Sequence, residues 1–318
     1  MKILVSGCAG FIGSHVCLKL LKNTNDIIIG IDNINEYYNK EQKEYNLKNL
    51  QKYDNFIFVK EDIVSTKIIE KYKPEKVCHL AACAGVRYSI ENPCLYSRVN
   101  IEGFINLLEQ ACKTNVKTFV YASSSSVYGL EKEIPFHEKV KIDKCNSPYA
   151  VTKRCKELFA DMFHRLYSDI SIIGLRFFTV YGPQGRPDMA PYKFLNSIIN
   201  NEEITQYGDG NSKRDYTYID DIVDGIISAL ENKKEIKCEV INLGNSNPIT
   251  LKQFINTCEK ISNKKAKIKI IENQKGDVPI TFANIEKAQR LLDYNPKTDI
   301  EIGLTKTFEW MNYNKKNK

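Results

Sequence analysis

Short apolar runs alternate with longer helix-like segments along the first part of the chain. The runs are rich in β-branched residues and end at small or polar residues, in KILVSG, IIIGID, FIFVKED, KVCHLAA, TFVYASS and SIIGLRF. Near-continuous apolar strands that alternate with helices are typical of a parallel sheet covered on both faces. The pattern predicts an α/β fold with a doubly wound parallel sheet of the Rossmann type.

The alternation loosens after about residue 180. YGPQGRPDMAP is rich in Gly and Pro, YGDGNSKRDY is rich in turn-forming residues, and VINLGN adds a possible strand. Helical patterns follow in TLKQFINTCEKI and ANIEKAQRLL. We expect a Rossmann domain over 1–178 and about 215–245, and a smaller discontinuous C-terminal domain over about 179–214 and 246–318, covering the carboxyl edge of the sheet.

Composition excludes several classes of protein. With 42% hydrophobic residues the 318-residue chain can form a large core, yet no apolar run approaches the roughly 20 residues of a membrane span. MKILVSG begins as a strand rather than as a signal peptide, so we expect a soluble, cytoplasmic protein without a membrane partner. The net charge of +7 comes from scattered lysines; without a basic stripe, nucleic acid is not an expected partner, whereas an anionic small substrate suits the charge.

The 10 cysteines are scattered, with no C-x-x-C pair and no histidine cluster beside them. We interpret them as reduced residues, most of them in the core, and expect neither disulfides nor a metal site.

Glycines follow the first predicted strand directly. GCAGFIG places Gly7, Gly10 and Gly13 before a helix-like run, with the spacing G-x-x-G-x-x-G. Such glycines allow a tight turn and close approach to a pyrophosphate, and the helix N-terminus offers free N–H groups. Asp32 ends the second strand, where a carboxylate accepts hydrogen bonds from the adenosine ribose and repels a 2'-phosphate, which favours NAD over NADP. Asp62, after the next strand, is a candidate contact for the adenine.

A tyrosine and a lysine lie four residues apart in SPYAVTK. If this segment is helical, Tyr149 and Lys153 share one face. Tyrosine ordinarily has a pKa of about 10, so as a base near neutral pH it needs a positive charge beside it, which Lys153 supplies. The serines of ASSSSVYG end the preceding strand, at the edge where such sheets bind ligands.

With these features together, the chain resembles the extended short-chain dehydrogenase/reductase family over essentially its whole length. It is most similar to the nucleotide-sugar 4-epimerases, and to their UDP-glucuronate 4-epimerase branch in LAACAGVRYSIENP, FFTVYGPQGRPDMAP, RDYTYIDDIVDGI and KGDVPITFANIEKAQRLL. The resemblance implies an isomerase that uses NAD to invert C4 of a UDP-hexose by transient oxidation to a 4-keto sugar, without net redox change. It also implies a homodimer formed through two helices per subunit, here at about 101–114 and 149–167.

The resemblance further implies residue roles. Ser124 would hydrogen-bond the sugar 4-hydroxyl, Tyr149 would be the base, and Lys153 its electrostatic partner and a ligand of the nicotinamide ribose. The implied cofactor-binding residues are Gly7, Gly10, Phe11, Ile12, Gly13, Asp32, Asn33, Asp62, Ile63, Leu80, Ala81, Ala82, Asn100, Ser123, Tyr149, Lys153 and Phe177. The implied substrate-binding residues are Arg87, Ser125, Ser126, Thr179, Arg186, Thr205, Gln206, Tyr207, Arg214, Gln274 and Asp277.

Two of these positions bear on the substrate. Thr179 and Gln274 agree with the glucuronate branch, whereas many UDP-glucose 4-epimerases have Asn and Arg there. Cys83, Gln184 and Lys275 depart from that branch, which usually has glutamine, tryptophan and proline at these places. UDP-glucuronate and UDP-glucose, with or without its N-acetyl relatives, therefore both stay open as substrates.

Other readings are less favoured. Dehydratases of the family need an Asp-Glu pair where this chain has Ser125 and Ser126, and decarboxylases usually have Glu nearby. A non-catalytic NAD sensor would typically lack the Tyr/Lys pair, which this chain retains.

Overall fold

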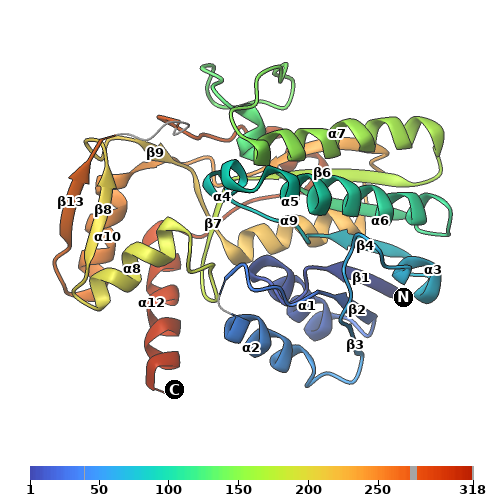
Figure 1. Cartoon of the computed structure of the whole chain (residues 1–318), viewed down its shortest axis with the longest axis horizontal. Helices are drawn as coiled ribbons and strands as arrows, with labels where there is room; N and C mark the ends of the chain where they lie inside the picture. The colour runs from blue at the N-terminus through green and yellow to red at the C-terminus, as the bar shows by residue number, and fades with distance from the viewer. Residues whose placement is uncertain (39, 273–277, 317–318) are drawn as a thin grey trace.

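A seven-stranded parallel sheet forms the centre of the computed structural model, which describes residues 1–38, 40–272 and 278–316 (Figure 1). Its strands lie in the order β11-β6-β5-β4-β1-β2-β3. They are β1 (Lys2–Ser6), β2 (Ile27–Ile31), β3 (Phe56–Val59), β4 (Lys76–His79), β5 (Thr118–Ser124), β6 (Ser171–Phe177) and β11 (Cys238–Leu243). The order reverses between β1 and β4, so the predicted doubly wound α/β fold is confirmed and its ligand crevice is expected at the carboxyl ends of these strands.

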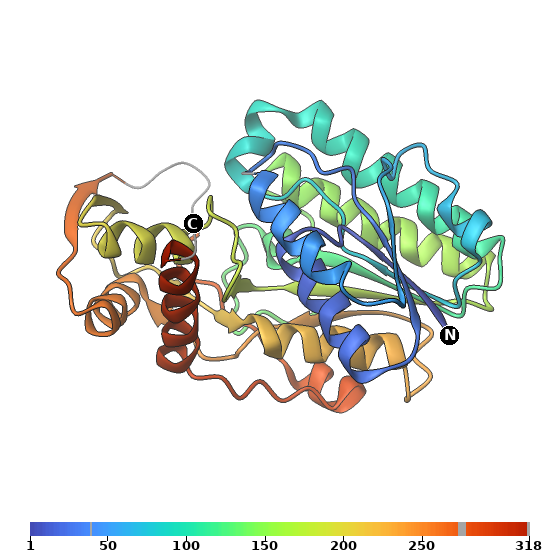
Figure 2. The ribbon, with the colours of Figure 1, turned by 90° about the horizontal axis from the view of Figure 1, so that it is seen from below.

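Helices cover both faces of the sheet (Figures 1 and 2). On one face α1 packs against α2 and α9, and on the other α6 packs against α3 and α7. The bounds on these faces are α1 (Phe11–Asn23), α2 (Lys40–Leu50), α3 (Ile68–Tyr72), α6 (Gly103–Cys112), α7 (Pro148–Leu166) and α9 (Ile219–Glu231). Burial on both faces explains why every residue of β5 is buried and why the strands are almost continuously apolar.

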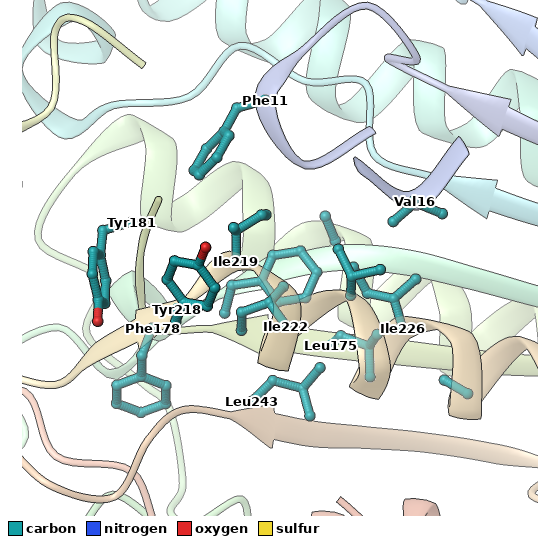
Figure 3. Close-up of a cluster of buried hydrophobic side chains, with 14 of the residues drawn as sticks. Phe11, Val16, Leu175, Phe178, Tyr181, Tyr218, Ile219, Ile222, Ile226 and Leu243 are labelled. Atoms are coloured by element: carbon teal, nitrogen blue, oxygen red, sulfur yellow. The ribbon is translucent and has the colours of Figure 1, made fainter. Parts of the chain in front are cut away.

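Helix α9 shows how these layers are joined. Ile219, Ile222 and Ile226 are fully buried and recur at helical spacing. Figure 3 shows this stripe between Val16 of α1 and Leu175 of β6, with further apolar side chains around it. Each such buried side chain contributes about 1.5–3 kcal/mol to stability, so the stripe anchors α9 between sheet and α1.

A second group of elements lies beyond the carboxyl ends of the sheet strands (Figures 1 and 2). Within it β8 pairs with β13 and β7 with β10, both parallel, while β9 and β12 are antiparallel. Its elements are β7 (Thr179–Tyr181), α8 (Ala190–Ile199), β8 (Glu203–Tyr207), β9 (Lys213–Arg214), β10 (Tyr216–Tyr218), β12 (Ile249–Thr250), α10 (Leu251–Ser262), β13 (Lys267–Ile271) and α12 (Ile300–Lys316).

The predicted helix in ANIEKAQRLL begins later than its pattern, as α11 (Glu286–Leu292). The Ala283 N–H donates to Asp215 and the Asn284 N–H to the Phe136 carbonyl, at 3.0 and 2.9 Å. These long-range bonds hold the first residues of the pattern outside the helix. Helix α11 packs against β11 and α9.

Among the helices that the structure describes, none combines the length and the apolar character needed to span a membrane.

Candidate active site

A pocket of about 370 Å³ opens at the carboxyl edge of the sheet. It is lined by the loops after the central strands, the N-terminus of α7 and the start of β7. Ser124 and every predicted cofactor residue except Asn100 line it. So do Ser125, Ser126, Thr179 and Arg186 of the predicted substrate set. The fold thus joins segments more than 170 residues apart in one cavity.

The glycine loop closes tightly around the start of α1. Gly7 has φ +74°, and a Cβ there would lie 2.9 Å from the Ala81 nitrogen. A Cβ on Gly13 would lie 2.1 Å from the Gly7 carbonyl oxygen. Only glycine fits this geometry without displacing backbone. The loop therefore presents bare backbone and the first N–H groups of α1 to the pocket, which suits a pyrophosphate.

Asp32 is held at the end of β2 by two backbone groups. Its carboxylate accepts the N–H of Ala9 at 3.2 Å and that of Ile34 at 2.9 Å. Burial raises the pKa of Asp32, an effect that these N–H groups and Lys43 oppose. The anchored carboxylate lies beside the glycine loop, the arrangement that binds an adenosine ribose.

Tyr149 and Lys153 lie on the first turns of α7. Ser147 caps this helix by accepting the Ala150 N–H at 3.2 Å, and Pro148 occupies its first turn. The Lys153 ammonium donates to the Ala122 carbonyl at 2.9 Å and lies 5.5 Å from the centroid of the Tyr149 ring. Burial lowers the pKa of Lys153, and its side chain lines the pocket.

The serine run is ordered. Ser124 is the last residue of β5, and its hydroxyl accepts the Ser126 N–H at 3.2 Å, which caps a 3₁₀ turn, η2 (Ser125–Tyr128). The Ser124 hydroxyl also donates to the Ser126 hydroxyl at 3.2 Å. Ser123 lines the pocket, as expected for a cofactor neighbour, but its hydroxyl donates to Glu157 at 2.6 Å. The four serines therefore have distinct environments.

Arg186 reaches the pocket from the loop after β7. Its guanidinium donates to both carboxylate oxygens of Asp188, at 3.0 and 2.5 Å, and to the Ala84 carbonyl at 3.2 Å. It also lies 5.3 Å from the Tyr37 ring centroid. These contacts fix the position of the Arg186 guanidinium. The exposed Asp188 carboxylate partly offsets its positive charge.

Several predicted residues lie outside this pocket. Asn100 lies in a π-helical turn, η1 (Arg98–Glu102), where it is fully buried. Its side chain pairs with the Cys83 backbone, accepting the N–H at 2.8 Å and donating to the carbonyl at 2.9 Å. Cys83 itself lines the pocket. Asn100 is therefore a support for a pocket wall rather than part of its lining.

The predicted uridine and phosphate residues belong to α4 (Val86–Glu91) and to the second group of elements. Arg87 donates to the Tyr207 hydroxyl at 3.3 Å and lies 4.6 Å from its ring centroid, which joins α4 to the end of β8. Thr205 and Gln206 lie on β8 and Arg214 on β9. The predicted positions Gln274 and Asp277, with the departure at Lys275, lie outside the described residues.

Sequence reasoning did not assign several other lining residues. Lys43 is the most informative, because its buried ammonium donates to the Asn35 carbonyl at 2.8 Å and to its side-chain oxygen at 2.7 Å, near the Asp32 carboxylate. No sequence motif links α2 to the pocket. The contact between Lys43 and Asn35 is therefore visible only in the folded structure. The remaining unassigned lining residues are Asn35, Tyr37, Tyr38, Glu61, Cys83, Ala84, Gly85, Val86, Val99, Ala122, Phe178, Val180 and Met189.

Known proteins resemble this chain along its whole length. A family model described as GDP-mannose 4,6 dehydratase matches residues 4–307. UDP-glucuronate 4-epimerase of Thermodesulfobacterium geofontis is 44% identical over 98% of this chain and 96% of that protein.

Solved structures agree with that likeness. UDP-glucuronic acid 4-epimerase from Bacillus cereus, in complex with UDP-glucuronic acid and NAD, matches with a TM-score of 0.94 at 38% identity, covering 98% of this chain and 99% of that one. UDP-glucose 4-epimerase from Thermotoga maritima, with UDP-glucose, matches at 0.90 and 32% identity, covering 99% of both chains. The chain therefore belongs to the extended short-chain dehydrogenase/reductase family, among its nucleotide-sugar 4-epimerases.

Proposed function

We propose that this chain is an NAD-dependent UDP-sugar 4-epimerase, which inverts C4 of a UDP-hexose. One observation carries the proposal: Ser124, Tyr149 and Lys153 line the same pocket as the glycine loop and Asp32. A hydroxyl, a phenol beside an ammonium and a dinucleotide cradle are the groups that oxidation and reduction at a sugar alcohol need.

The residues present fit NAD. Gly7 and Gly13 leave a cradle that a Cβ would fill, and Asp32 presents an anchored carboxylate for the adenosine ribose. The other lining residues of the predicted cofactor set complete the site. NAD held there supplies reversible hydride acceptance at C4 of the sugar, and it is regenerated in each cycle.

The chain's own groups handle the proton. In our proposal the Tyr149 phenol oxygen takes the 4-hydroxyl proton and later returns it, while Ser124 hydrogen-bonds the same oxygen of the sugar. The Lys153 amine lies 5.5 Å from the centroid of the Tyr149 ring, and in our proposal it interacts electrostatically with Tyr149 during the proton transfer. We also propose that Lys153 binds the nicotinamide ribose.

Inversion needs a substrate that is firmly held at one end. We propose that uridine and the diphosphate are held by Arg87 of α4 and by residues of the second group of elements, which we assign to the substrate-binding domain. Arg87, joined to Tyr207, lies at its junction with the sheet domain. The proposed anchors are Arg87, Thr205, Gln206, Tyr207, Arg214, Gln274 and Asp277. Anchoring the nucleotide leaves the hexose free to present either face to the cofactor.

For the hexose we favour UDP-glucuronate. Ser125, Ser126, Thr179 and Arg186 line the pocket and offer hydroxyls and a guanidinium for a carboxylate at C6. The likeness to the enzyme from Thermodesulfobacterium geofontis supports this choice. The likeness to a UDP-glucose 4-epimerase keeps UDP-glucose as the second candidate.

One assay separates these candidates. Purified protein is incubated with UDP-glucuronate, UDP-glucose or UDP-N-acetylglucosamine, and the C4 epimer is followed by NMR. We expect conversion of the acid to exceed that of the neutral sugars. Conversion of only neutral sugars would refute the choice of acid, and conversion of none would refute the epimerase and favour an NAD sensor.

We further propose a homodimer formed through α6 and α7. Val151 and Leu158 on α7 are 46% and 53% exposed, and a second copy would cover such apolar side chains. Light scattering should give twice the 36.5 kDa mass of one chain.

We propose a cytoplasmic location, which the ten free thiols support.

A further inference from the structure

Helix α7 holds the end of β5 at two consecutive residues. The Lys153 ammonium binds the Ala122 carbonyl at 2.9 Å, and Glu157, one turn further on, accepts the Ser123 hydroxyl at 2.6 Å. Tyr149, Lys153 and Glu157 are spaced four residues apart and share one helix face. The face of α7 that carries Tyr149, the proposed base, is therefore hydrogen-bonded to the two residues that directly precede Ser124.

Glu157 is itself held by a buried arginine. Arg176 of β6 donates to both of its carboxylate oxygens at 2.8 Å, and Arg154 donates to it at 3.0 Å. Arg176 and Glu157 are 2% and 3% exposed, and Arg176 is the direct neighbour of Ser123 across the sheet. Although burial opposes ionisation, the bonds from Arg176 hold the pKa of Glu157 below its usual value. The pair is a fixed, charged support beneath Ser123.

The same arginine also reaches the far side of the serine run. Its guanidinium donates to the Tyr128 hydroxyl at 2.9 Å, and that hydroxyl donates to the Asn242 side chain of β11 at 2.7 Å. Tyr128 is the last residue of η2. The segment that contains Ser124, Ser125 and Ser126 is thus tied at both ends, through Ser123 and Tyr128, to one buried ion pair.

We propose that Glu157 and Arg176 are positioning residues that set the place of Ser124 relative to Tyr149. The inference rests on the proposed epimerase function. Neither residue is among those that line the pocket, so they act through Ser123 and Tyr128 rather than on the substrate. A rigid support of this kind is needed because a displacement of about 1 Å at a reacting group costs up to roughly 100-fold in rate.

The test compares single hydroxyl and carboxylate changes. Ser123→Ala and Tyr128→Phe each remove one tie, and Glu157→Gln weakens the support itself. Asp161→Asn is the matched control, since Asp161 lies one turn further along α7 in an exposed pair with Arg165. For the three variants we expect kcat to fall roughly 10- to 100-fold with KM within about twofold, and for the control no change.

A double mutant distinguishes positioning from general damage. If Ser123 acts through Ser124, adding Ser123→Ala to Ser124→Ala should lower kcat by less than about twofold further. Amide hydrogen exchange should rise in the peptide over 123–128 in Ser123→Ala and Glu157→Gln, but not in Asp161→Asn.

Each outcome has one meaning. A wild-type chain that inverts no UDP-sugar overturns the proposed function and with it this inference. An active wild type whose Ser123→Ala and Tyr128→Phe variants keep its kcat overturns the inference alone. The inference is also overturned if Ser123→Ala lowers kcat by the same factor in the wild type and in the Ser124→Ala variant, because the effect of Ser123 would then be independent of Ser124.

Discussion

The Lys153 ammonium lies 5.5 Å from the centroid of the Tyr149 ring and is bound to the Ala122 carbonyl. One helical turn separates the two residues on α7. The sheet thus fixes the cation, and the helix fixes the phenol relative to it. The distance between the two groups is therefore set jointly by helix α7 and by the end of β5.

Replacing Tyr149 by Phe removes the proposed base and little else. We expect kcat to fall by at least about 100-fold, with unchanged circular dichroism and unchanged NAD affinity by calorimetry. Loss of NAD binding together with activity would indicate a structural role, and near-normal turnover would refute the assigned base.

Gly13→Ala should disrupt the cofactor cradle. Its Cβ would lie 2.1 Å from the Gly7 carbonyl oxygen, so backbone must move. Gly10→Ala is the matched control, because there the nearest atom is 3.2 Å away. We expect a drop of roughly tenfold or more in NAD affinity for Gly13→Ala, and a smaller one for Gly10→Ala. Equal NAD affinities in the Gly13→Ala and Gly10→Ala variants would contradict the conclusion that the turn at Gly13 has no room for a Cβ.

Arg186→Met tests recognition of an acidic hexose. A charge-assisted hydrogen bond contributes about 1.5–3 kcal/mol, so kcat/KM for UDP-glucuronate should fall roughly 10- to 100-fold, with a smaller loss for UDP-glucose. Arg186→Lys keeps the charge without the fork and should be intermediate. An equal fall in kcat/KM for both sugars would show that Arg186 supports the pocket, through Asp188 and Ala84, and does not contact the C6 group of the hexose.

Lys156 should make stability depend on pH. Its ammonium is fully buried beside His79, at 3.1 Å. Burial, and then the charge of Lys153, hold the pKa of Lys156 well below its usual value. Above that lowered pKa and below about 10.4 the unfolded chain binds more protons than the folded one, so stability rises with pH.

Urea unfolding at pH 7 and pH 9 measures this dependence. Lys156→Met should reduce the rise in unfolding free energy, by at most about 1.4 kcal/mol per pH unit. Lys113 is an exposed lysine paired with Glu109. The Lys113→Met variant should leave the rise in unfolding free energy between pH 7 and pH 9 nearly unchanged. An unaltered rise in the Lys156 variant would show that this lysine stays charged in the folded state.

Local patterns were enough to predict the sheet and the glycine loop at its edge. Apolar runs identified the strands, and the spacing of Gly7, Gly10 and Gly13 with a distant Asp32 predicted residues that line one pocket, because these features depend on contiguous residues and on regular strand ends. The contact of Asn100 was not predictable in this way: its side chain pairs with the Cys83 backbone and does not line the pocket. A motif gives proximity along the chain but not the direction of a side chain.

By itself, the sequence determined the fold class and the family, because these follow from residue type, periodicity and motif spacing. Only the tertiary structure decided how the serine run is divided. Ser123 turns to Glu157, while Ser124 and Ser126 bond to each other. That division depends on Arg176, which arrives from a neighbouring strand 53 positions further along the chain than Ser123. Pairings at such separations are set by the packing of sheet and helix, which no local pattern encodes.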